Sequence, residues 1–98
     1  MAKPLPKYLQ LDATGVTVTL TRPTDLNGIG TDKVRLRVPT VRDMRIASST
    51  AGGDEEQGEM NLFANLAEVS TKDLEGMDLK DYTRLQTGYF RLVREDEV

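Results

Sequence analysis

Aliphatic and polar side chains alternate in two segments of the N-terminal half, and this alternation predicts two β-strands. Between residues 16 and 21 every second side chain is Val or Leu and the others are Thr, whereas between residues 33 and 38 the others are Lys or Arg. Because successive side chains of a strand point to opposite faces, each strand has one apolar face. We expect the aliphatic side chains to cover one side of a core: Val16, Val18, Leu20, Val34, Leu36 and Val38.

Turn-forming residues between these strands predict an antiparallel hairpin. The gap 23–32 contains the pair Asn27 and Gly28, followed by Gly30. Asn and Gly favour turns because both tolerate backbone conformations that other residues avoid. The length of the gap predicts a hairpin loop longer than the tight two-residue kind.

A helical pattern begins after Pro39. Thr40 precedes Asp43 by three residues, which is an approximate capping box in which each side chain bonds an otherwise unpaired backbone amide. The first helix is therefore expected to start at Thr40 and to be stopped by the run 48–53, which ends in two glycines. Its inward stripe is expected to contain Val41, Met44, and Ala47 or Ser48.

Two further helices are indicated downstream. The acidic run 54–56 complements the positive end of a helix dipole and marks the start of the second helix. Ser70 followed by Asp73 repeats the start signal for a short third helix, with Leu74 and Met77 as its apolar residues. The buried face of the second helix is expected to contain Met60, Phe63, and Leu66 or Ala67, widened by Leu62 and Val69.

The last helix is expected over about 79–94, after a start signal at Asp78 and Asp81. Its apolar positions are spaced by three or four residues, which is the pattern of an amphipathic helix, and Gly88 is its weak point. The stripe contains Leu79, Tyr82, Leu85, Tyr89 and Leu92, with Phe90 and Val93 beside it.

Together these patterns predict the α+β class, with an N-terminal antiparallel β-hairpin followed by three to four short α-helices. Residues 1–13 are expected to form an extended lead-in, within which Leu9 and Leu11 permit a short strand. Residues 14–95 are expected to form a single α+β domain, and residues 96–98 a frayed acidic C-terminus. A chain of 98 residues has room for one small core.

The composition removes most catalytic and metal-binding chemistry. The chain has no Cys and no His, so it lacks disulfides, thiolate nucleophiles and the usual general base and metal ligand. The acidic residues 54–56 and 59 lack the alternation of a calcium-binding loop. We therefore expect no catalytic residue, no metal and no cofactor, and a protein that is not an enzyme. Apolar runs far shorter than a membrane span and the lack of a signal peptide predict a soluble protein of a reducing cytoplasm.

Charge is unevenly divided along the chain. Residues 1–50 carry eight basic and four acidic side chains, whereas residues 51–98 carry five basic and twelve acidic ones. Opposite charges at the two ends favour head-to-tail self-association, although acidic side chains also simply solvate helices.

A basic cluster is the best argument for nucleic acid. It contains Lys33, Arg35, Arg37, Arg42 and Arg45. Basic side chains on one strand face follow a phosphate backbone well. However, the net charge of −3 opposes binding to a polyanion, and no aromatic side chains alternate with the basic ones. An exposed strand face is the preferred interpretation, and nucleic acid is disfavoured as a partner.

Two segments resemble a known family. The segment 34–44 reads VRLRVPTVRDM, and the segment 74–86 reads LEGMDLKDYTRLQ. With the hairpin and the acidic helix start, they resemble the tail assembly chaperones of contractile-tailed phages of the Mu and P2 kind over residues 16–94. The resemblance implies a protein of the host bacterial cytoplasm that binds the tape measure protein, keeps it soluble, assists tail tube polymerisation around it, and is not retained in the virion. A small structural or nucleic-acid-binding phage accessory protein is the alternative.

The last two large helices carry more apolar surface than one small hairpin covers. Such a surface either completes the core or receives a partner helix. We expect it to bind the tape measure protein, with the tail tube protein and a second copy of the chain as further partners and no membrane contact. The expected partner-binding residues are Phe63, Leu66, Tyr82, Leu85, Tyr89, Phe90 and Val93.

Overall fold

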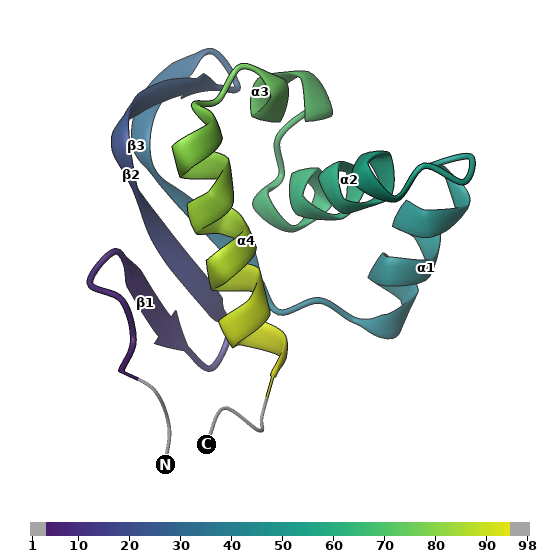
Figure 1. Ribbon diagram of the computed structural model, residues 1–98, viewed down its shortest axis with the longest axis horizontal. Helices are drawn as coiled ribbons and strands as arrows, with labels where there is room; N and C mark the ends of the chain where they lie inside the picture. Colours follow the sequence, from purple (N-terminus) through teal and green to yellow (C-terminus); the bar gives the residue numbers. More distant parts are fainter. Residues whose placement is uncertain (1–3, 95–98) are drawn as a thin grey trace.

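The fold combines an antiparallel sheet with a set of helices, which confirms the predicted α+β class. The computed structural model describes residues 4–94 of the chain (Figure 1). The expected frayed C-terminus over 96–98 lies outside these residues. In the described range the elements are β1 (Leu9–Asp12), β2 (Gly15–Leu26), β3 (Ile29–Arg37), α1 (Val41–Ser49), α2 (Glu55–Ala67), α3 (Thr71–Glu75) and α4 (Leu79–Val93).

The sheet has the order β1-β2-β3, with both pairs antiparallel. Val18 lies opposite Val34 on one side and opposite Leu9 on the other. The short strand that Leu9 and Leu11 permitted is therefore β1, which extends the predicted hairpin to three strands.

The loop predicted to be long is a tight turn. β2 and β3 pair up to Leu26 and Ile29, and only Asn27 and Gly28 connect them, with φ of 55° and 79°. Asn and Gly occupy this left-handed region at low cost, so the strands continue to the turn. The register is interrupted instead between Thr19 and Thr24.

The core lies between the sheet and the helices. α4 crosses one face of the sheet, and α2 lies beside it (Figure 1). Val38, predicted to be buried, is 43% exposed because β3 ends before it. The buried side chains include Val16, Val18, Leu20, Val34, Leu36, Leu62, Phe63, Leu66, Leu74 and Leu85.

The predicted helix starts are confirmed. Thr40 caps α1 through a complete capping box with Asp43. Asp54, Ser70 and Asp78 cap the other three helices of the described chain by accepting hydrogen bonds from backbone amides. These caps satisfy donors that the first turn of a helix leaves unpaired.

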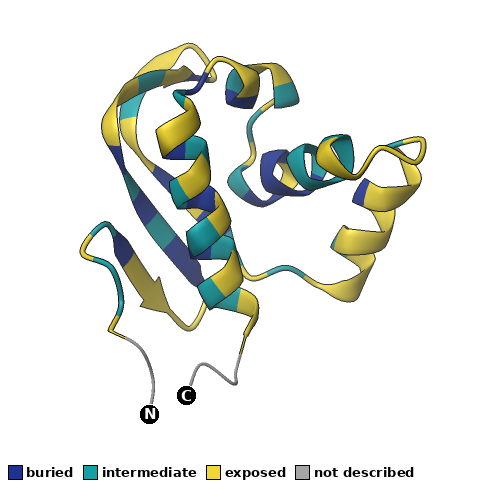
Figure 2. Cartoon of the chain, in the orientation of Figure 1, coloured by how far each residue is buried: buried dark blue, intermediate teal, exposed yellow. Residues whose placement is uncertain are grey.

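The predicted inward stripe of α1 is wrong for two of its members. Val41 is 72% exposed and Met44 is 53% exposed, whereas Ala47 is buried. The reason is that α1 packs against α2 and stands apart from the sheet (Figure 1), so one neighbour covers only a narrow part of it. Most of α1 is coloured as exposed in Figure 2.

Candidate protein-binding site

The residues expected to bind a partner occupy three different environments. Phe63 and Leu85 are fully buried, and Leu66 is 2% exposed. These three side chains belong to the core between α2, α4 and the sheet. A partner that docks on the folded domain therefore does not reach them directly.

Two tyrosines of α4 surround Phe63 and are half-buried. The ring centroids of Tyr82 and Tyr89 lie 5.6 Å and 5.3 Å from that of Phe63, in tilted arrangements that favour aromatic contact. The Tyr82 hydroxyl donates a 2.8 Å hydrogen bond to Glu59. Burial, followed by this hydrogen bond, raises the pKa of Tyr82 above its ordinary value.

The remaining two residues lie at the surface near the end of α4. Phe90 is 45% exposed and Val93 is 41% exposed. The guanidinium of Arg94 lies 4.6 Å from the centroid of the Phe90 ring, in a cation–π contact. In the folded domain, the accessible part of the expected site is thus the C-terminal half of α4.

Tyr89 also borders a hollow between α1, α2 and α4, with a volume of about 340 Å³. Its apolar lining includes Met44, Ala47 and Leu62 in addition to Tyr89. Met44 was not among the expected site residues, because its position in the α1 stripe indicated burial. Only the packing of α1 against α2 places this side chain at the edge of a hollow.

Three acidic residues from one segment also line the hollow. Asp54 and Glu55 come from the start of α2, and Glu59 lies one turn further along. An apolar floor with an acidic edge is suited to the apolar face of a helix whose flanking side chains are basic. Two residues of the acidic run predicted to start α2, Asp54 and Glu55, therefore also line this hollow.

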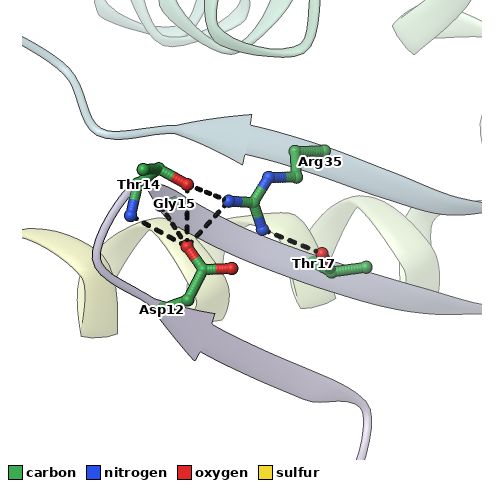
Figure 3. Close-up of polar contacts among 5 residues, drawn as sticks. All are labelled: Asp12, Thr14, Gly15, Thr17 and Arg35. Carbon is green, nitrogen blue, oxygen red and sulfur yellow. Dashed lines mark hydrogen bonds and ion pairs between the residues drawn. The ribbon is translucent and has the colours of Figure 1, made fainter.

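The two arginines of the basic cluster that lie on β3 are paired within the chain. Arg35 pairs with Asp12 at 2.7 Å and also bonds Thr14 and Thr17, as Figure 3 shows. Asp12 in turn accepts hydrogen bonds from the Thr14 and Gly15 amides, so it closes the turn between β1 and β2 (Figure 3). The hydrogen bond from Arg35 is the main reason why the pKa of Asp12 lies far below its usual range.

A second arginine of the cluster is paired in the same way. Arg37 contacts Asp43 at 2.7 Å, at the start of α1, and this contact lowers the pKa of Asp43. Two of the five basic residues are thus neutralised by partners within the chain. The structure gives little support to a phosphate-binding strand face.

Other kinds of site are not formed by the part of the chain that is described. Among residues 4–94, no three Asp, Glu, His or Cys side chains are grouped to hold a metal ion. No helix within the same range has the length and apolar character needed to cross a membrane.

Comparison with known protein families gives a match over most of the chain. The family model described as "Phage tail assembly chaperone proteins, E, or 41 or 14" matches residues 17–94, which include the hairpin β2–β3 and all four helices given above. No curated protein and no solved structure matches the chain.

Proposed function

Because the chain belongs to the family of phage tail assembly chaperones, we propose that it binds the tape measure protein of its phage. It keeps that protein soluble in the host bacterial cytoplasm and assists polymerisation of the tail tube around it. The chaperone then leaves and is not retained in the virion. The tail tube protein and a second copy of the chain are further partners, and the chain carries out no catalysis.

The observation that supports this proposal is the accessible apolar surface at the C-terminal half of α4. Phe90 and Val93 are exposed there, and Tyr89 links them to the acidic-edged hollow beside α1 and α2. A partner helix laid on this surface removes its own apolar face from water. Binding of the unassembled partner lowers the concentration of the aggregating species, which is the physical basis of a holding chaperone.

The seven expected residues then have two roles. Tyr82, Tyr89, Phe90 and Val93 contact the partner or border the contact, since each retains accessible surface. The buried members, Phe63, Leu66 and Leu85, support these side chains from below. Apolar residues of neighbouring positions on α4 therefore have different roles, some in the core and some in contact with the partner.

Co-expression with the tape measure gene of the same phage tests the proposal. The double variant Phe90→Glu/Val93→Glu places two charges on the surface, whereas the control Ile29→Glu changes a 68% exposed side chain beside the β2–β3 turn. We expect wild type and control to keep the tape measure protein soluble and to co-purify with it. The double variant is expected to lose both effects while its far-ultraviolet circular dichroism is unchanged.

Two results would overturn this assignment. Co-purification of the double variant at wild-type yield would remove the α4 surface from the site. Equal loss in the Ile29→Glu control would show that the effect does not depend on that surface. Mass spectrometry of purified mature particles tests release, since a structural component persists in the tail and a chaperone does not.

A further inference from the structure

We propose that the outer face of α1 docks into an acidic, apolar hollow between α2, α3 and α4 of a second copy of the chain. This inference rests on the self-association given under the proposed function and assigns it to two specific surfaces. The hollow concerned is separate from the one beside Tyr89, because the two share only Glu59 among their lining residues.

The first surface is the outer face of α1, which carries Val41, Arg42, Arg45, Ile46 and Ser49. These positions repeat at intervals of three or four residues, so they share one side of the helix. Val41 is 72% exposed and Ile46 is 52% exposed.

The arginines of this face are available to an outside partner. The side chains of Arg42 and Arg45 make no hydrogen bond or ion pair with any other residue of the described range 4–94, in contrast to those of Arg35 and Arg37. The outer face of α1 thus has two aliphatic side chains that remain exposed and two cations that no acidic side chain of residues 4–94 neutralises.

The second surface is a hollow of about 450 Å³ where the first half of α2 meets α3 and α4. Its apolar lining contains Met60, Leu74, Met77, Leu79 and Tyr82. Leu79 is 76% exposed, the largest value among the large apolar side chains of residues 4–94. The stripe predicted for α4 is wrong at this position because Leu79 is the first residue of the helix and points beyond the core.

Three glutamates give this hollow a negative edge: Glu56, Glu59 and Glu75. Glu59 is engaged, since it accepts hydrogen bonds from Tyr82 and Gln86. The carboxylates of Glu56 and Glu75 have no hydrogen-bond or ion-pair partner within the described part of the chain. The hollow therefore has the apolar lining and the free negative charge that match the outer face of α1, and opposite charges set the orientation of docking.

The two surfaces cannot meet within one molecule. Asn61 of α2 bonds the Ala47 carbonyl and the Thr50 hydroxyl, so α1 turns that side toward α2. Arg42 and Arg45 lie on the other side of the helix, away from α2. Because each copy presents one face and one hollow, the contact joins two different surfaces, and it extends from copy to copy unless the rotation between copies closes a ring.

Two matched variants test the inference. Val41→Glu alters only the α1 face, and Leu79→Glu alters only the hollow. Both positions are the first residue of a helix and about three-quarters exposed, and a negative charge there is compatible with folding. We expect each substitution to weaken self-association at least about tenfold, because it replaces an aliphatic side chain of the contact by a carboxylate that must lose its water on docking.

Sedimentation velocity over a concentration series gives the readout. Wild type is expected to increase in mass with concentration, and less so at high salt, because ions screen the Arg–Glu attraction. Each variant alone is expected to remain a monomer at concentrations at which wild type assembles. An equimolar mixture is expected to form a 1:1 dimer and nothing larger, since Leu79→Glu retains an intact α1 face and Val41→Glu retains an intact hollow.

The possible failures are distinguishable. A wild type that stays monomeric throughout the series overturns self-association and with it this inference. Assembly of wild type without dimer formation in the mixture overturns the two surfaces but leaves self-association in place. Co-purification of Val41→Glu with the tape measure protein is measured separately, so failure of the proposed chaperone function is not confused with either result.

Discussion

The Asp81 carboxylate accepts a 2.7 Å hydrogen bond from the backbone amide of Thr21, although the two residues are 60 positions apart. Thr21 lies where the β2–β3 register is interrupted, between Thr19 and Thr24. Nearby, Arg84 donates a 2.8 Å hydrogen bond to the Thr19 carbonyl. Side chains of α4 thus satisfy backbone groups of β2, and Asp81, only 1% exposed, fastens the helix to the irregular part of the strand.

Asp81→Ala is expected to destabilise the domain by about 1–3 kcal/mol, because it removes the acceptor of the Thr21 amide. Asp81→Asn retains an oxygen in that place and is expected to cost less. Urea unfolding followed by circular dichroism measures both losses. The exposed Asp32→Ala serves as the control for removal of a carboxylate. Equal losses for the Ala and Asn variants would show that the charge, rather than the hydrogen bond, is what matters.

Gly88 is expected to tolerate a methyl group less well than Gly58. A Cβ at Gly88 would lie 3.0 Å from Val18 and 3.2 Å from Leu9, which are both buried, whereas a Cβ at Gly58 would have its nearest neighbour at 3.5 Å. Gly58→Ala should therefore gain about 0.5–1 kcal/mol from helix propensity. Gly88→Ala should lose about 1 kcal/mol through overpacking, despite the same gain in propensity. Thermal and urea unfolding of the two variants test the contrast, and two stabilised variants would contradict it.

Acid should weaken the domain partly through Asp43. Its folded-state pKa is depressed, chiefly by the hydrogen bond from Arg37 and then by that from the Thr40 amide. A depressed pKa contributes stability that is present above the unfolded-state value, about 4, and is lost as the pH falls through the folded-state value. Wild type should therefore lose urea resistance more steeply than Asp43→Asn below about pH 4. Parallel curves for the two proteins would exclude this role.

Alkali should act through Tyr82, whose pKa is raised by burial and by the hydrogen bond to Glu59. A raised pKa contributes stability that is present below the unfolded-state value, about 10, and is lost as the pH rises through the folded-state value. Tyr82→Phe keeps the ring contact with Phe63 but cannot ionise. We expect the variant to be less stable by about 0.5–1.5 kcal/mol near neutral pH and to lose less stability than wild type above about pH 10. Urea unfolding at several pH values measures both effects.

The local features of the fold follow well from sequence patterns. Alternation located the strands that contain Val16 and Val34, and the spacing of Thr40 and Asp43 located the start of α1. Such signals depend on residues close together in the chain, where period and capping are local properties. The hairpin loop was the exception. Asn27 and Gly28 were recognised as turn residues, but the continued pairing on both sides depends on the whole ladder.

The residues of the candidate sites could not be predicted from the spacing of apolar positions alone. An apolar position in a helix pattern looks the same whether a sheet, a partner or only water covers it. Met44 and Leu79 were therefore assigned to buried stripes, whereas they lie at the surface. The roles of Asp81 toward Thr21 and of Gly88 toward Val18 were likewise invisible, because both contacts join α4 to β2 across most of the chain.

By itself, the sequence determined the α+β class, the helix starts and the family, because period, caps and short motifs are properties of neighbouring residues. Only the tertiary structure decided which apolar faces are covered. Leu85 lies on the side of α4 that packs against the core, whereas Phe90, five residues later on the same helix, is exposed to water. The difference comes from the size of the domain, whose three-stranded sheet and neighbouring helices cover one side of α4 and leave α1 with a single neighbour.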